Sequence, residues 1–133
     1  MHIILVVVSL VLVQISTAYA DDCESPETQA MMNECASLAF KKSDSELNAA
    51  YKQIRARLNS DGNTRKMLTA AQRAWVTYRD AECAFLASGV AGGSVYPSVY
   101  ADCLDSLTTR RIDDFQAYLT CKEGDLSCPV PAD

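Results

Sequence analysis

Apolar side chains recur at helical spacing along the chain from about residue 25. Ser25, Pro26 and Glu27 supply an N-cap, a first-turn proline and an acid near the positive end of a helix. The apolar positions that follow are three, four or eight residues apart, which keeps them on one helix face. They are Met32, Cys35, Ala39, Leu47, Tyr51, Ile54 and Leu58. We therefore predict a helix that starts at Ser25.

The apolar pattern of this helix is interrupted at Ser43. The run Ser43-Asp44-Ser45-Glu46 has the form of a capping box, which is typical of a helix start. The segment is therefore predicted to be either one long helix or two helices joined at this point.

A second helix is predicted after residues 59–63, a turn whose glycine and asparagines tolerate positive φ. It runs from Thr64 to about Ala87, before the glycine-rich stretch 88–94 that cannot continue it. Its periodic positions are Leu68, Ala71, Trp75, Val76, Arg79, Cys83 and Leu86. Trp75 is expected to be an anchor of the core.

Pro97 suits the first turn of a third helix, which Gly124 and Pro129 are expected to end. Its periodic positions are Tyr100, Leu104, Leu107, Arg111, Phe115 and Tyr118. No convincing alternation of apolar and polar residues predicts a strand. We therefore predict an all-α fold, a small antiparallel bundle of three or four helices over residues 21–120, followed by a short tail, 121–133.

Short connections make consecutive helices antiparallel, so residues of two neighbouring helices pair at a constant sum of their numbers. Around the turn at 59–63 this sum is about 123. The pairs it predicts are Asp44 with Arg79, Asn48 with Trp75, and Tyr51 with Gln72. We expect Arg79 and Asp44 to form a partly buried ion pair, and Gln72 and Asn48 to hydrogen-bond across the helix pair.

The first twenty residues have the form of a secretory signal peptide. An apolar run from Ile3 to Val13 leads to Ala18-Tyr19-Ala20, an A-x-A cleavage site. The run is too short for a comfortable membrane span, although an uncleaved anchor is the alternative. Acidic residues, not the small residues of a lipobox, precede Cys23. We expect cleavage after Ala20 and a periplasmic or extracellular protein.

Six cysteines follow the predicted cleavage site, and an even number in a short exported chain indicates a disulfide framework. Free buried thiols are the alternative. Around the glycine-rich stretch the pairing sum is about 186, which favours a bridge between Cys83 and Cys103. Six cysteines allow fifteen pairings. The nearest remaining pairs are Cys23 with Cys35 and Cys121 with Cys128.

Charge and composition exclude several classes of function. The net charge of −5 repels phosphate backbones, so nucleic acid is not an expected partner, whereas a basic protein would be attracted. The single histidine, His2, leaves with the signal peptide, which removes histidine-based nucleophile pairs and imidazole zinc sites. We expect no cofactor and no metal, because the carboxylates lack the spacing of a calcium-binding loop.

Catalysis by paired carboxylates is the alternative to binding. Asp80 and Glu82 are two residues apart on a helix and point to different faces. Asp102 and Asp105 are three apart and could meet, but such a pair is usually a solvated helix face. We therefore expect that the protein is not an enzyme.

Four sequence runs together resemble one family. They lie at residues 28–35, 47–51, 71–83 and 92–97, and they include Leu-Asn-x-x-Tyr, Gln-Arg-x-Trp-x-x-Tyr-Arg-Asp-x-x-Cys and Gly-Gly-Ser. In this order they closely resemble the LprI-type lysozyme-inhibitor domain family, over roughly Cys23 to Leu119. The resemblance implies a small exported helical domain of bacterial envelopes, and it suggests stoichiometric inhibition of a c-type lysozyme.

The exposed element best suited to binding a partner is the glycine loop, residues 88–97. Gly92 and Gly93 let its backbone approach a partner closely, and Ser94 and Tyr96 offer hydroxyl groups. A bridge beneath the loop would reduce the entropy lost on docking. The alternatives are that the glycines only permit a tight helix connection, and that the protein is a structural or small-ligand-binding envelope module.

Overall fold

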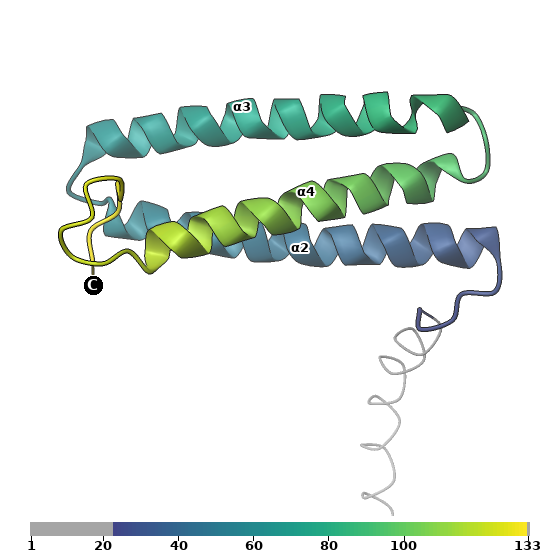
Figure 1. Ribbon diagram of the computed structural model, residues 1–133, viewed down its shortest axis with the longest axis horizontal. Helices are drawn as coiled ribbons and strands as arrows, with labels where there is room; N and C mark the ends of the chain where they lie inside the picture. The colour runs from purple at the N-terminus through teal and green to yellow at the C-terminus, as the bar shows by residue number, and fades with distance from the viewer. Residues whose placement is uncertain (1–22, 133) are drawn as a thin grey trace, which may run out of the picture.

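The computed structural model describes residues 23–132, so the predicted signal peptide lies outside the described residues. Three long helices, α2 (Gln29–Arg57), α3 (Gly62–Leu86) and α4 (Tyr96–Leu119), make up most of the fold (Figure 1). A short 3₁₀ helix, η1 (Ala87–Val90), precedes the glycine turns. Residues 23–132 contain no strand, and the predicted all-α bundle is confirmed.

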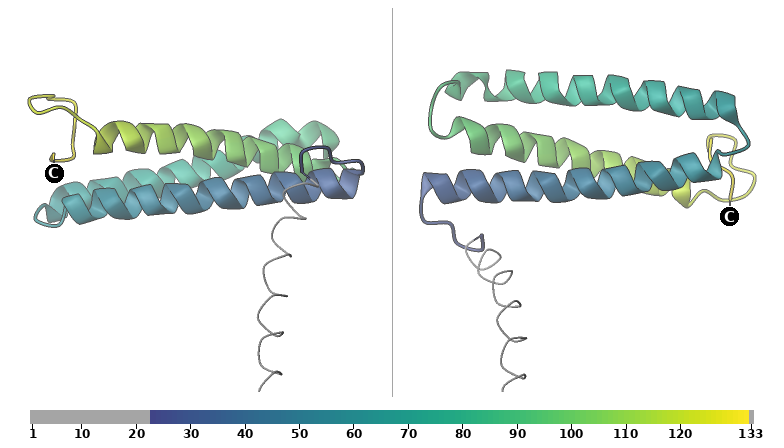
Figure 2. Two further views of the ribbon diagram at one scale, coloured as in Figure 1. Left: turned by 90° about the horizontal axis from the view of Figure 1, so that it is seen from below. Right: turned by 180° about the vertical axis from the view of Figure 1, so that it is seen from behind.

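The three helices run up, down and up, so that α2 and α4 are parallel and α3 is antiparallel to both (Figure 1). The main packing interface joins α2 to α4, which are not consecutive in the chain. Hydrogen bonds tie the two helices at both ends, from Gln29 to the Ser98 hydroxyl (3.2 Å) and from Arg57 to the Leu119 carbonyl (2.7 Å). Figure 2 shows α3 as the outer member of the bundle.

The first helix starts later than predicted, at Gln29 instead of Ser25. The Thr28 hydroxyl caps it by accepting a hydrogen bond from the Met31 amide (3.2 Å). A helix from Ser25 to Cys35 would be about 15 Å long, too long for the two residues before it to return to Cys35. The disulfide between Cys23 and Cys35, with 5.5 Å between their Cα atoms, therefore requires a later start.

The segment around Ser43 belongs to one continuous helix, which decides between the two predicted alternatives. Ser43 is buried, and its hydroxyl donates to the Phe40 carbonyl (3.1 Å) instead of capping a new helix. A small side chain at this position lets a neighbouring helix approach α2 closely.

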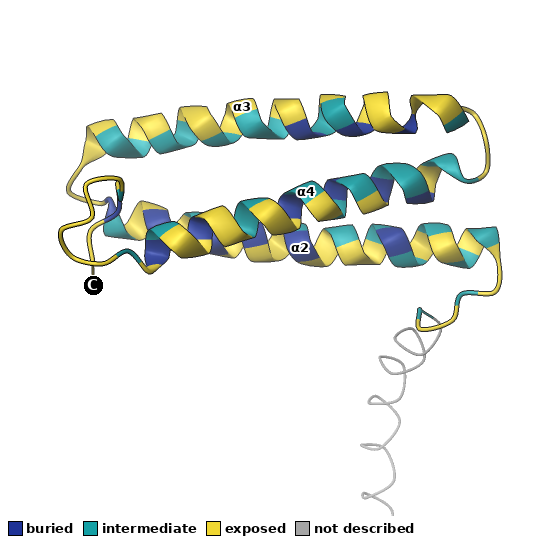
Figure 3. Ribbon diagram, in the orientation of Figure 1, coloured by how far each residue is buried: buried dark blue, intermediate teal, exposed yellow. Residues whose placement is uncertain are grey.

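The apolar core lies at the end of the bundle that holds the turn between α2 and α3, which we call the turn end. Its buried members are Leu47, Ala50, Ile54, Leu58, Phe115, Leu119 and Val130. Trp75 is half-buried and packs against this cluster from α3. Figure 3 shows that α3 is mostly exposed or half-buried along its length, with Arg79 and Cys83 as its buried residues.

Two large residues assigned to the apolar stripes are exposed instead. Met32 keeps 40% of its surface accessible and Leu86 keeps 57%. Both lie in the terminal turn of their helix, where the apolar periodicity continues but the neighbouring helices no longer cover the side chain. Ala39 and Ala71 are exposed as well, and on α2 the buried positions include Ala36 and Ala50. The apolar periodicity therefore identified each helix but only part of its buried face.

The third helix starts near Pro97 as predicted but ends at Leu119, before Gly124. At the C-cap, the Thr120 hydroxyl (2.8 Å) and amide (3.0 Å) both donate to the Gln116 carbonyl. The tail that follows is closed by the bridge between Cys121 and Cys128, and its Val130 enters the core.

Candidate functional site

The glycine loop is a series of tight turns at the other end of the bundle, which we call the loop end. Gly92 has a positive φ of 78°, which favours glycine, and a Cβ atom on Gly93 would lie 3.2 Å from the Val90 carbonyl oxygen. The Gly93 amide donates to that carbonyl (3.0 Å) and the Tyr96 amide donates to the Gly93 carbonyl (3.2 Å). The loop therefore has a defined backbone conformation.

A disulfide and a hydrogen bond hold this loop in place. The predicted bridge between Cys83 and Cys103 is formed, with 5.5 Å between the Cα atoms, and joins α3 to α4 directly behind the loop. From α2, the Asn33 amide group donates to the Ser94 carbonyl (3.0 Å). The sequence did not indicate this second anchor, because nothing in the pattern placed the start of α2 beside the loop.

The two hydroxyl residues predicted for binding have different surroundings. Ser94 is exposed, and its side chain makes no hydrogen bond within residues 23–132. Tyr96 is half-buried and its ring stacks on Tyr100, with centroids 5.7 Å apart and planes inclined by 8°. Burial, and then the charge of Asp80, raise the pKa of Tyr100 above its ordinary value of 10.0, so its hydroxyl stays protonated. Ser94 is thus available to a partner, whereas Tyr96 is fixed by its neighbour.

An apolar surface beside the loop was missed by the sequence analysis. Phe85 keeps 75% of its surface accessible, and the adjacent Leu86 lines an open groove of about 500 Å³ between α3 and α4. The residues that line it are Tyr78, Glu82, Leu86, Val99, Asp102, Cys103, Ser106, Leu107 and Arg110. One signal could have revealed it, because two consecutive large apolar residues at a helix end cannot both face the same core.

The charge around the loop is negative. Residues 74–106 contain four acids, Asp80, Glu82, Asp102 and Asp105, and a single cation, Arg79. Arg79 is buried and paired, so it does not offset the field at the surface. A partner that approaches the loop end therefore meets an acidic, partly apolar surface.

Arg79 organises the middle of the bundle. Its guanidinium donates to the carboxylates of Asp44 (3.3 Å) and Asp80 (2.9 Å) and to the buried Thr108 hydroxyl (3.3 Å). The side chain also lies over the rings of Phe40 (5.1 Å) and Trp75 (5.2 Å). The predicted ion pair between Arg79 and Asp44 is therefore present, and it joins α3 to α2.

The hydrogen bond predicted between Asn48 and Gln72 is not formed, and Tyr51 and Gln72 each bond to another residue. Asn48 donates to Asp44 within its own helix (3.3 Å) and not to Gln72. The Tyr51 hydroxyl hydrogen-bonds with Thr69 (3.0 Å), and Gln72 accepts from Arg111 of α4 (3.2 Å). The pairing sum assumed that α2 packs most closely against α3. In the structure α2 packs most closely against α4, and Arg111 of α4 is the hydrogen-bond partner of Gln72.

The carboxylates considered for catalysis have different surroundings. Asp80 is paired with Arg79 (2.9 Å), and Asp102 is exposed on α4. Within residues 23–132, no group of three or more histidines, cysteines and acids could hold a metal ion. In the same part of the chain, no helix has both the length and the apolar character needed to cross a bilayer.

Comparison with known proteins agrees with the resemblance found in the sequence motifs. A family model described as "Lysozyme inhibitor LprI" matches residues 20–115. A relative from Rhizobium meliloti (strain 1021), "Uncharacterized protein R02472", is 28% identical over 114 residues, which cover 77% of this chain and 82% of the relative. No solved structure matches the chain significantly. The chain belongs to the LprI lysozyme inhibitor family.

Proposed function

We propose that this protein acts outside the cytoplasm as a non-catalytic binding module that inhibits a lysozyme by stoichiometric binding. Membership of the LprI family supports a lysozyme as the partner. Three disulfides join all six cysteines, as is usual in chains that fold in an oxidising compartment. The signal peptide predicted for residues 1–20 would deliver the chain there.

The observation that supports the proposal is an exposed side chain on a firmly anchored backbone at the loop end. The Ser94 side chain is exposed and unpaired, while the backbone beside it is held by the Asn33 hydrogen bond and by the bridge between Cys83 and Cys103. A loop that is already ordered loses little conformational entropy on docking, so more of its contact energy appears as affinity. Its small side chains suit entry into the substrate cleft of another protein.

The groove beside the loop, whose two acids Glu82 and Asp102 outnumber its one cation Arg110, would complement a basic lysozyme. The stem of a lysine or arginine from the partner could lie against Leu86 and Val99, because such side chains bury their methylene groups and keep the charge outside. Its charged head would then reach Glu82 or Asp102 at the edge of the groove. Attraction of this kind steers association and weakens as salt rises, with a Debye length of about 10 Å at 0.1 M.

Calorimetric titration of the mature protein into a basic c-type lysozyme at low salt tests this proposal. We expect saturable one-to-one binding and a matching loss of cell-wall digestion. The double variant Ser94→Ala with Tyr96→Ala should bind about tenfold more weakly or worse, which corresponds to about 1.4 kcal/mol. Tyr96→Phe is the matched control, because it keeps the stacking on Tyr100 and removes only the hydroxyl.

Circular dichroism and thermal unfolding must show that the double variant is folded. Absence of any heat of binding to lysozyme at tens of micromolar protein and low salt would contradict the inhibitor function. An equal loss of binding and folding in Ser94→Ala with Tyr96→Ala, but not in Tyr96→Phe, would show that the loop supports the fold instead of the partner.

A small-ligand-binding module is the second candidate, and one cavity favours it. A cavity of about 240 Å³ at the turn end is lined mostly by apolar side chains, among them Leu58, Met67, Leu68, Tyr118 and Val130. This volume is below the usual range of about 300–1,000 Å³ for ligand pockets, so only a small apolar molecule would fit. Native mass spectrometry of the secreted protein would detect such a ligand as a constant added mass.

A further inference from the structure

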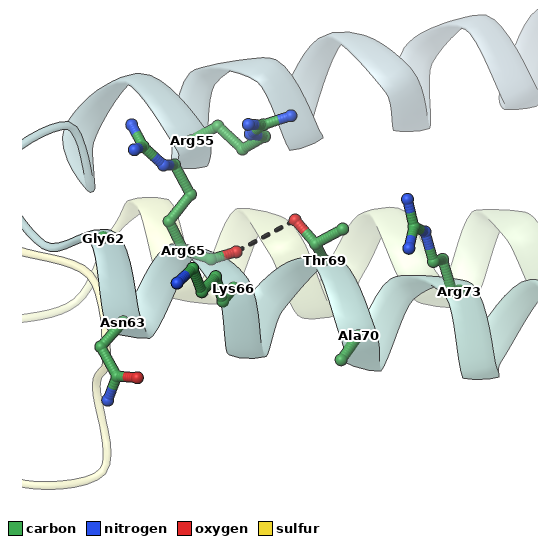
Figure 4. A pocket seen from close by; sticks show the side chains of 8 residues that line it. All are labelled: Arg55, Gly62, Asn63, Arg65, Lys66, Thr69, Ala70 and Arg73. Carbon is green, nitrogen blue, oxygen red and sulfur yellow. Dashed lines mark hydrogen bonds between the residues drawn. The ribbon is translucent and has the colours of Figure 1, made fainter.

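A groove lined by positive charge lies between α2 and α3 at the turn end. Arg55 reaches into it from α2, and Arg65, Lys66 and Arg73 line it from α3 (Figure 4). The remaining lining residues are Gly62, Asn63, Thr69 and Ala70, so no acid takes part. Figure 4 shows the side chains of Arg55 and Arg65 in the same space between the two helices.

These four cations have no carboxylate partner among residues 23–132, unlike Arg79 and Arg111, which both form ion pairs. The contacts they do make are weak or neutral. Arg55 lies over the Tyr51 ring at 5.8 Å, and Arg65 is 3.5 Å from the Asn59 side-chain oxygen. Like charges in one groove repel each other, and a bound anion would remove that repulsion.

The groove is the centre of a broader concentration of positive charge. Residues 50–73 contain six of the twelve cations of the chain but only one of its seventeen acids, Asp61. The carboxylate of Asp61 caps α3 and is occupied by the amide (2.9 Å) and the hydroxyl (2.6 Å) of Thr64. The turn end is therefore locally cationic although the whole chain has a net negative charge.

We propose that this groove is an anion-binding site for phosphate groups. Arginine presents a planar fork of donors that fits two oxygens of a phosphate, and Lys66 adds a point charge. The amide side chain of Asn63 makes no hydrogen bond within the described chain and is available as a neutral donor. The stretch of α3 from Gly62 to Arg73 is about 17 Å long, which suits a short oligophosphate or a few lipid headgroups.

A long nucleic acid fits this arrangement poorly. Beyond residues 50–73 the chain carries sixteen acids and six cations, so a duplex that extended past the groove would meet repulsion. The site also lies at the opposite end from the glycine loop (Figure 1), so its occupation would leave that loop free. This inference therefore does not depend on the proposed inhibitor function.

The test uses inorganic tripolyphosphate as the soluble probe and vesicles as the lipid probe. Calorimetry at low salt should show saturable binding of tripolyphosphate to the mature protein. Sedimentation with vesicles of phosphatidylglycerol and phosphatidylcholine, compared with vesicles of phosphatidylcholine alone, shows whether headgroup phosphates in an anionic surface are bound as well. Binding of both probes assigns the site to phosphate in general, and binding of the anionic vesicles alone assigns it to lipid.

The variant Lys66→Gln with Arg73→Gln removes two exposed cations of the groove whose side chains make no hydrogen bond or ion pair within the described residues. It should weaken binding at least tenfold without changing the melting temperature. Lys41→Gln with Lys42→Gln is the matched control, because it removes the same charge from exposed positions on α2 outside the groove. It should weaken binding less than threefold.

Three results would overturn the assignment. One is no binding of either probe at low salt. Another is an equal loss of binding in the groove variant and the Lys41/Lys42 control, which would mean that only net charge matters. The third is binding of a DNA duplex with no binding of tripolyphosphate or anionic vesicles.

Discussion

The two ends of the bundle are stabilised in different ways although the same three helices form both. At the turn end, large apolar side chains such as Leu47, Ile54 and Phe115 fill the space between helices. At the loop end, buried positions are mostly small, as at Ala36 and Ala101, and a disulfide with polar anchors holds the chain. An end that is not held by a large core can leave Phe85 and Leu86 exposed for a partner.

The charges follow the same division. Residues 50–73 at the turn end are strongly basic, whereas residues 74–106, which lead to and from the loop, contain four acids and one buried cation. A single net charge of −5 describes neither end. The contrast indicates two surfaces that attract partners of opposite charge.

The largest effect is expected from a pair of identical substitutions at opposite ends. Phe115 is fully buried in the core, so Phe115→Ala should lower the free energy of unfolding by about 3–5 kcal/mol. Phe85→Ala removes the same atoms from an exposed position and should change it by less than about 0.5 kcal/mol. Chemical denaturation measures both. Similar losses for the two variants would mean that the loop end also depends on apolar packing.

The bridge at the loop end should have the next largest effect. Replacing Cys83 and Cys103 by serine opens a loop with a sequence separation of 20 and should lower the free energy of unfolding by about 3 kcal/mol. Because the bridge lies behind the glycine loop, amide hydrogen exchange should rise most in residues 88–96. Unchanged exchange there would show that the turns and Asn33 hold the loop without the bridge.

A smaller loss of stability is expected for a substitution of Arg79, which lies between the two ends. Arg79→Met nearly keeps the length of the side chain but removes the cation from Asp44 and Asp80 and the donor from the buried Thr108 hydroxyl. Because the Asp44 side chain is 41% exposed, solvent already screens part of its interaction with Arg79. We therefore expect the free energy of unfolding to fall by about 2 kcal/mol. Arg110→Met, an exposed position on α4, is the control and should be close to neutral. A neutral result for Arg79→Met would show that the ion pairs and hydrogen bonds of Arg79 do not stabilise the packing of α3.

The smallest effect concerns pH and the cap of α3. Hydrogen bonds from the Thr64 hydroxyl and then its amide lower the pKa of Asp61 below its ordinary value of 3.8. A lowered folded-state pKa contributes stability that is present above about pH 4 and is lost as pH falls through the folded value. Asp61→Asn keeps a capping oxygen but does not titrate, so its stability should fall less than that of the wild type between about pH 5 and pH 2.

The matched control for the pH experiment is Asp113→Asn, whose carboxylate makes no hydrogen bond within the described chain. Its unfolding curve should follow the wild type over the same pH range. An identical pH response of the Asp61 and Asp113 variants would remove the assigned role of the Asp61 cap.

Local patterns in the sequence predicted most of the fold. Helical periodicity, the turn at 59–63 and Pro97 gave the three helices, and the pairing sum gave the bridge between Cys83 and Cys103. These features depend on neighbours in the chain or on a short connection. The contact of α2 with α4 could not be found in this way, because it joins helices separated by more than thirty residues.

The candidate site was predicted only in part. Gly92 and Ser94 were proposed from the glycine-rich loop, but the sequence placed Leu86 in the core, since periodicity does not tell where a covering helix ends. The cationic groove was missed for a different reason. Arg55 and Arg73 come from different helices, and only the fold brings them to one surface, while the net charge pointed the other way.

Nuclear magnetic resonance tests the division between the two ends most directly. Titration of the ¹⁵N-labelled mature protein with an unlabelled basic c-type lysozyme at low salt should perturb the amides of residues 85–96 and leave residues 62–73 nearly unchanged. The same pattern should fade as salt rises, because the attraction at the loop end is electrostatic. Perturbation centred on residues 62–73, or no perturbation anywhere, would contradict the assignment of the loop end to partner binding.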